Sequence, residues 1–150
     1  MGHSFANILV HIVFSTKNRH DWIVPSVEQE LYRYLITICH LWACPALAIG
    51  GTENHVHILC RQERTVTTSK LVERIKTGSS LWLKTKGPQL AGFAWQHGYG
   101  AFSIGVSNLP ALQRYIAAQK EHHKSTIFQD ELRGLLRQYQ IEYDERYLWD

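Results

Sequence analysis

The sequence predicts an α+β fold, in which helices pack on one or both faces of a mostly antiparallel sheet. Two observations lead to this class. Short runs rich in apolar, β-branched and aromatic residues alternate with stretches whose apolar residues recur at helical spacing. Their order along the chain is strand–helix–strand–strand–helix–strand–helix, which indicates helices covering a sheet.

The first half of the chain supplies three strands and one helix. The apolar and β-branched run over residues 6–15 predicts the first strand. A Pro-Ser pair opens an amphipathic stretch that predicts a helix over 25–39. A short apolar segment at 45–49 predicts a second strand, and the glycine-rich segment 50–54 predicts a turn into a third strand at 55–61.

The second half begins with a helix predicted over 67–84, which a Lys-Gly-Pro sequence at 86–88 ends. Residues 93–106 are aromatic and β-prone but interrupted by glycines, as in bent strands. Asparagine and proline then mark the start of a third helix, predicted over 109–124.

The length and charge of the chain fit one small domain. It has 150 residues, which we interpret as a single domain with a core over 6–128 and a polar C-terminal tail over 129–150. Leucines in this tail suggest a short further helix. Sixteen basic and 13 acidic residues give a net charge of only +3. This is a mild bias toward anionic partners and does not identify nucleic acid.

Cysteine usage and hydropathy favour a soluble, cytoplasmic protein. The chain has three cysteines, Cys39, Cys44 and Cys60, an odd number too small for a disulfide framework. Its N-terminus lacks the order of basic, apolar and small residues of a signal peptide. No apolar run approaches the roughly 20 residues that span a bilayer.

Two histidines two residues apart form the first candidate site. In a strand, His55 and His57 project from the same face and can converge on one ion, while Val56, Ile58 and Cys60 face the other way. A cysteine-based zinc site is not expected, because the chain has no CxxC pair and Cys60 points away from the histidines.

A tyrosine and a glutamine form the second candidate pair. Tyr115 and Gln119 are four residues apart, which places them on one side of a helix, and His122 lies on that side as well. A helix that faced the two-histidine strand would bring a hydroxyl nucleophile and an amide ligand to a metal site. We take Gln119 as the third ligand and keep His122 as its alternative.

Each of these groups has a part in phosphodiester chemistry. A divalent ion polarises the phosphate and offsets developing charge. A mixed set of nitrogen and oxygen ligands suits Mg²⁺ or Mn²⁺ better than a closed zinc site. A tyrosine hydroxyl has a usual pKa of about 10 and is a poor nucleophile, so it must be placed next to the metal to attack the phosphate. Its product is a phosphotyrosine link, which simple hydrolysis would not need.

At these residues the chain resembles the single-tyrosine HUH transposases, which include the REP-associated tyrosine transposases. The HUH motif matches His55-Val56-His57, and the YxxxQ motif matches Tyr115 through Gln119. Asn54 departs from the aspartate that the family often has before the first histidine. The resemblance covers about residues 8–128. It rests on five segments in the family's order: STKNR, IGGTENHVHIL, IKTGSSLW, WQHGYGAFSIGVS and RYIAAQKEHH.

The resemblance implies a ferredoxin-like sheet and a transposase that cleaves and rejoins single-stranded DNA, often at a hairpin. It implies a 5′-phosphotyrosine on Tyr115, a free 3′-hydroxyl, and a metal held by His55, His57 and Gln119. Many members are homodimers in which the tyrosine helix serves the other subunit, whereas some REP-associated members are monomers. Only the resemblance, and not the spacing, implies that the pair His55 and His57 lies close to the pair Tyr115 and Gln119.

Basic residues are the candidate DNA contacts, and other functions stay open. A histidine-triad hydrolase is excluded because Leu59 stands where a third alternating histidine is needed. A metal-dependent nuclease would not require Tyr115, and a catalytically silent hairpin-binding protein could keep the same fold. The candidate phosphate contacts are Lys17, Arg19, Lys70, Arg74 and Lys76.

Overall fold

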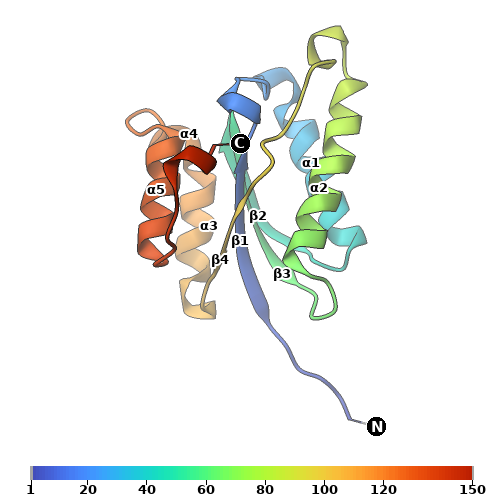
Figure 1. The fold of residues 1–150 in the computed structure, drawn as a ribbon. Coiled ribbons are helices and arrows are strands. Elements are labelled where there is room, and N and C mark those ends of the chain that lie inside the picture. Colours follow the sequence, from blue (N-terminus) through green and yellow to red (C-terminus); the bar gives the residue numbers. More distant parts are fainter. Residues whose placement is uncertain (1, 150) are drawn as a thin grey trace.

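The computed structural model describes residues 2–149, and its centre is a four-stranded antiparallel sheet (Figure 1). The strand order is β2-β3-β1-β4, so β1 and β3 are the two central strands. Ser15 pairs with His55 and Val13 with His57, which fixes the register of the centre. The strands are β1 (Ile8–Ser15), β2 (Ala46–Thr52), β3 (His55–Gln62) and β4 (Gly100–Ser103).

Helices α1 (Pro25–Leu41) and α2 (Thr68–Lys84) pack side by side on one face of the sheet (Figure 1). Leu35 and Ile75 are fully buried there against the side chains of Phe14 and other strand residues. The chain order β1–α1–β2–β3–α2–β4 with this strand order is the ferredoxin-like arrangement, as the resemblance implied.

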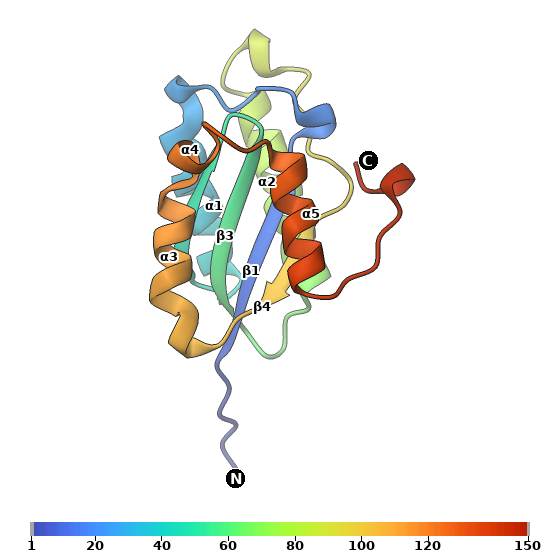
Figure 2. The ribbon, with the colours of Figure 1, turned by 90° about the vertical axis from the view of Figure 1, so that its left-hand side faces the viewer.

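The opposite face carries the last three helices, α3 (Leu109–Ala117), α4 (Gln119–His122) and α5 (Phe128–Gln138). Figure 2 looks at this face, with α3 and α5 on either side and β3 and β1 visible between them. A smaller apolar cluster fixes α5 to the sheet. It consists of Val13, Phe102, Phe128, Leu132 and Leu136. The predicted boundary at residue 128 therefore falls at the start of a helix that packs on the sheet.

Two elements differ from the sequence prediction. The helix expected over 109–124 is divided at Ala118, whose N–H is shared between the carbonyls of Arg114 and Tyr115, so Gln119 begins a separate helix. The strand expected over 93–106 is regular only in β4. Lys76 of α2 explains part of this, because its ammonium group donates to the carbonyls of residues 96, 97 and 98 and holds the chain in a bend.

The remaining structured segments are short 3-10 helices, of which η1 (Lys17–Arg19) follows β1. The others are η2 (Pro88–Leu90), η3 (Val106–Asn108) and η4 (Glu145–Tyr147). Cys39, Cys44 and Cys60 are buried free thiols. Among residues 2–149 there is no helix with the length and apolar character needed to cross a membrane.

Candidate active site

The two histidines of β3 lie on the face that α3 and α5 cover. His55 and His57 are both fully buried, and their rings approach edge to face with centroids 5.1 Å apart. Val56, Ile58 and Cys60 belong to the core on the opposite face, under α1 and α2. The alternation of the strand thus places both imidazoles on one side, as the spacing predicts.

The helical pair reaches the same place from α3 and α4. Gln119 is buried, and its Oε1 lies 3.0 Å from Nε2 of His55. The ring of Tyr115 meets the ring of His57 edge to face, with centroids 5.8 Å apart. The four residues selected from the sequence therefore converge within one chain.

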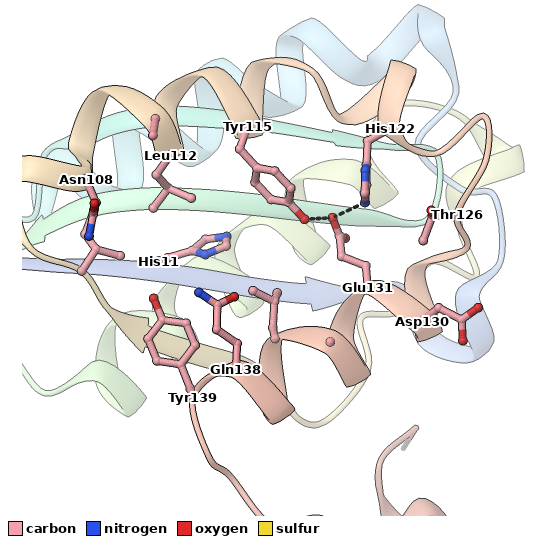
Figure 3. A pocket seen from close by; sticks show the side chains of 14 residues that line it. His11, Asn108, Leu112, Tyr115, His122, Thr126, Asp130, Glu131, Gln138 and Tyr139 are labelled. Carbon is pink, nitrogen blue, oxygen red and sulfur yellow. Dashed lines mark hydrogen bonds and ion pairs between the residues drawn. The ribbon is translucent and has the colours of Figure 1, made fainter.

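A carboxylate that the sequence analysis did not select lies at the centre of this group. Glu131 of α5 is buried, and its Oε1 lies 3.0 Å from Nε2 of His57 and 3.4 Å from Nε2 of His55. Its Oε2 accepts a hydrogen bond from the Tyr115 hydroxyl and another, of 3.1 Å, from Nε2 of Gln119. Figure 3 shows Glu131 and Tyr115 pointing toward one another from α5 and α3.

A signal for Glu131 exists in the sequence of α5. Phe128, Leu132 and Leu136 recur at helical spacing and form its apolar side. Glu131 is three residues after Phe128 and therefore lies within that side rather than on the solvent side. A charged residue inside an apolar helix face marks a position where the chain buries a carboxylate.

The far nitrogen of each imidazole is held by another side chain. Nδ1 of His55 lies 2.9 Å from Oδ1 of Asn54, so this amide holds the His55 ring. Nδ1 of His57 lies 2.7 Å from Nε2 of His11, a buried residue of β1. These contacts fix both ring orientations and leave both Nε2 atoms directed at Glu131.

Two further histidines surround the carboxylate. Nε2 of His123 lies 3.1 Å from Oε1 of Glu131, and Nε2 of His122 lies 3.4 Å from its Oε2. The ring centroid of His122 is also 5.5 Å from that of Tyr115. His122 therefore contacts Tyr115 and Glu131, whereas Gln119 contacts His55.

The electrostatics favour an ionised carboxylate beside neutral imidazole and phenol. Burial alone would raise the pKa of Glu131, but its close contacts with imidazoles, that with His123 first, outweigh this effect and hold the pKa well below its usual range. Burial lowers the pKa of His55 to about 4. Burial, together with the hydrogen bond to Glu131, raises the pKa of Tyr115 above its ordinary value.

The side chains present fit a divalent metal ion. Ligand atoms of His55, His57 and Glu131 lie within 4.8 Å of one another, and so do those of His122, His123 and Glu131. The first group is fully buried and its imidazoles are held in place, so it is the better preorganised of the two. Adding the Gln119 oxygen gives two nitrogens and two oxygens, a mixed set suited to Mg²⁺ or Mn²⁺.

A cavity of about 650 Å³ gives access to this group from the space between α3 and α5 (Figure 3). Tyr115 and Glu131 form part of its wall, and the other lining residues that Figure 3 labels include His11, Leu112 and Tyr139. Tyr115 and Glu131 thus face a space that a ligand can enter, whereas His55 and His57 do not line it.

The five predicted DNA contacts fall into two groups, one at an end of the sheet and one on helix α2. Lys17 and Arg19 lie in η1, directly after the end of β1 that pairs with His55. The other three lie on α2, across the sheet from Tyr115, and each already has a partner. Lys70 pairs with Glu73, Arg74 stacks on Trp42, and Lys76 binds backbone carbonyls.

Comparison with known families gives a match over most of the chain. The family described as "Transposase IS200 like" matches residues 4–119, which include both histidines, Tyr115 and Gln119. This match confirms the resemblance inferred from the five sequence segments. A search of curated protein sequences found no match.

Solved structures with similar folds include two transposases. A protein from Deinococcus radiodurans R1, assigned as a transposase, is 22% identical with a TM-score of 0.62, covering 79% of this chain and 96% of its own. A REP-associated tyrosine transposase bound to a REP hairpin is 15% identical with a TM-score of 0.61, covering 82% of this chain and 72% of its own. At these identities the likeness establishes the fold.

Proposed function

The chain belongs to the IS200-like transposase family, and from that premise we propose that it cleaves and rejoins single-stranded DNA through a covalent bond to Tyr115. One observation carries the proposal. The Tyr115 hydroxyl lies on the wall of a cavity beside two buried imidazoles and an amide oxygen. A nuclease that uses water needs no such tyrosine.

In the proposed reaction the Tyr115 oxygen attacks the phosphorus of one phosphodiester. The bond from phosphorus to the tyrosine oxygen forms as the bond to the 3′-oxygen breaks. The Tyr115 hydroxyl gives up its proton and the departing 3′-oxygen takes one up, so one DNA end becomes a free 3′-hydroxyl and the other is joined to the protein as a 5′-phosphotyrosine. Attack by a 3′-hydroxyl on the same phosphorus reverses the step and rejoins a strand, because no phosphodiester energy has been lost to water.

His55, His57 and Gln119 are the proposed metal-binding residues, with His122 as the alternative to Gln119. Bound Mg²⁺ or Mn²⁺ would supply a Lewis acid to the scissile phosphate. Asn54 and His11 keep the imidazoles directed at that position. Gln119 orients its amide between His55 and Glu131, and so links the ligand group to the residues that surround Tyr115.

The proposed substrate is single-stranded DNA with a hairpin, reached in the cytoplasm. The similar fold of a REP-associated transposase bound to a REP hairpin supports this choice. Lys17 and Arg19 lie at the end of the sheet where His55 begins, which suits contacts with phosphates near the cleaved bond. Lys70, Arg74 and Lys76, on α2, would contact more distant parts of the DNA.

Each chain carries a whole set of candidate catalytic groups. Tyr115 contacts Glu131 and the ring of His57 in the same chain. We therefore propose that Tyr115 attacks DNA bound at the metal site of its own chain. This holds even if two chains associate as the homodimer that the resemblance implies.

The test is formation of a protein–DNA adduct that survives denaturation. The full chain is incubated with Mn²⁺ and a single-stranded oligonucleotide carrying the hairpin that flanks its coding region. Tyr115→Phe should abolish the adduct and leave DNA binding unchanged. Tyr147→Phe is the matched control, because Tyr147 is 69% exposed and lies outside the site.

Other outcomes of the same assay support the two alternative functions. If the unaltered chain cleaves DNA without forming an adduct, and Tyr115→Phe cleaves it as well, the protein is a metal-dependent nuclease. Hairpin binding with no cleavage by the unaltered chain would make it a silent DNA-binding protein. Either result overturns the strand-transfer proposal.

A further inference from the structure

We infer that Glu131 has two tasks in this site, each performed by one of its carboxylate oxygens. Oε1 is a ligand of the metal held by His55 and His57, and Oε2 positions the Tyr115 hydroxyl beside it. The inference rests on the proposed function, and it adds to that site a residue from α5, outside the part of the chain that matches the family.

The case for ligation comes from three electron-rich atoms that face one another. Nδ1 of His55 lies 2.9 Å from the Asn54 oxygen, which is an acceptor, so in the tautomer that this contact favours Nε2 of the neutral ring carries a lone pair. That Nε2 lies 3.0 Å from Oε1 of Gln119 and 3.4 Å from Oε1 of Glu131, and both oxygens are acceptors. Acceptors converge in this way where a cation binds, and the carboxylate is the only one of the three with a negative charge.

The position of Glu131 argues against a role in docking α5 alone. Its side chain is 2% exposed, and a buried carboxylate is stable only when charge or hydrogen bonds compensate it. The apolar contacts that dock α5 are made by Phe128 and Leu132, so docking does not need a carboxylate at the intervening position. Phe128 also packs on the His55 ring, with centroids 4.6 Å apart, and thereby sets the distance between α5 and β3.

The case for positioning comes from the second oxygen. Oε2 accepts the hydrogen bond from the hydroxyl of Tyr115, and both residues line the cavity between α3 and α5. The same oxygen accepts from Nε2 of Gln119, whose Oε1 faces His55. One carboxylate therefore ties the nucleophile to the metal ligands, and it can set the tyrosine oxygen and the phosphate in line.

Manganese binding tests the ligand task without any DNA reaction. Isothermal titration of the full chain with Mn²⁺ is compared for the unaltered protein, Glu131→Gln and Glu121→Gln. Glu131→Gln keeps the shape and removes the charge, and it should weaken Mn²⁺ binding about tenfold or more. Glu121→Gln should have no effect, because the Glu121 side chain is 76% exposed and pairs with Lys124.

Two further measurements separate the possible failures. His55→Ala must also weaken Mn²⁺ binding; if it does not, the proposed metal site itself is wrong. If His55→Ala weakens binding and a folded Glu131→Gln binds Mn²⁺ like the unaltered chain, Glu131 is not a ligand. Should Glu131→Gln fail to fold, anomalous scattering from Mn²⁺ in crystals of the unaltered chain decides whether the ion contacts Oε1.

The positioning task has its own kinetic signature. Glu131→Ala, at saturating Mn²⁺ and DNA, should slow adduct formation by about 100-fold and leave the dissociation constant of the hairpin unchanged. Glu131→Gln, which can still accept a hydrogen bond from Tyr115, should recover part of that rate. Equal adduct rates in Glu131→Ala and the unaltered chain at saturation would overturn the positioning role.

Discussion

Gly50→Ala should displace the helix that carries Tyr115. Gly50 lies in β2, beside His57 of β3, and α3 crosses directly above it. A Cβ at Gly50 would lie far inside van der Waals contact of the Ile116 carbonyl oxygen and 3.2 Å from the carbonyl carbon. Because this neighbour is backbone, it cannot rotate away, and α3 has to move together with Tyr115.

Overpacking of this kind costs about 1–3 kcal/mol of unfolding free energy. For a chain of this length that lowers Tm by about 2–12 °C. A displacement of about 1 Å at a reacting group slows the reaction by about 100-fold, so adduct formation should fall to that extent. Urea unfolding and the adduct rate at saturating Mn²⁺ and DNA measure the two effects.

Gly105→Ala is the matched control for this substitution. Gly105 precedes α3, and a Cβ there would meet only the Ser107 hydroxyl at 3.9 Å, an ordinary contact. It should change neither stability nor adduct rate appreciably. If Gly50→Ala behaves like Gly105→Ala in both measurements, α3 does not pack on β2 as described, and the assembly of the site within one chain is refuted.

Three other measurements probe the core, the metal and the thiols. Phe128→Ala removes a side chain that is 2% exposed and should lower the unfolding free energy in urea by about 3–5 kcal/mol; a loss below about 1 kcal/mol would contradict the packing of α5. Mn²⁺ at 100 times its dissociation constant should stabilise the fold by about 2.7 kcal/mol and raise Tm by about 5–11 °C, an increase that His55→Ala should remove. Burial raises the pKa of Cys39 and of Cys60 to about 12, so neither thiol should react with Ellman's reagent before unfolding, and rapid labelling of the native chain at neutral pH would argue against their burial.

Local periodicity predicted most of the helices and strands and the orientation of the histidines, whereas the ferredoxin-like sheet was implied only by the family resemblance. The alternation of β3 separates His55 and His57 from Val56 and Ile58, and both pairs lie on the faces predicted for them. The glycines in residues 93–106 predicted a bent strand, but the position of the bend before β4 was not predictable, because it depends on Lys76, which is distant in sequence and binds the carbonyls of residues 96 and 98.

The composition of the site depended on long-range packing. Periodicity placed Tyr115 and Gln119 on one helical side, but the approach of Tyr115 to His57 and of Gln119 to His55 requires α3 and α4 to pack across the sheet. Glu131 was not selected, because a single acidic residue in a polar C-terminal segment has no motif around it. The position of Glu131 on the apolar side of α5 was the available signal. This position indicates that the carboxylate is buried, but it does not identify the side chains that surround it.

The most direct test of the proposed chemistry is to locate the DNA on the chain. The denatured adduct is digested with nuclease and trypsin and analysed by mass spectrometry. Trypsin cleaves after Arg114 and Lys120, so the peptide YIAAQK contains Tyr115 as its only tyrosine. We predict that a nucleotide linked through a 5′-phosphate is found on this peptide. The same modification on a peptide without Tyr115, or cleaved DNA with no modified peptide, would contradict a covalent role for Tyr115.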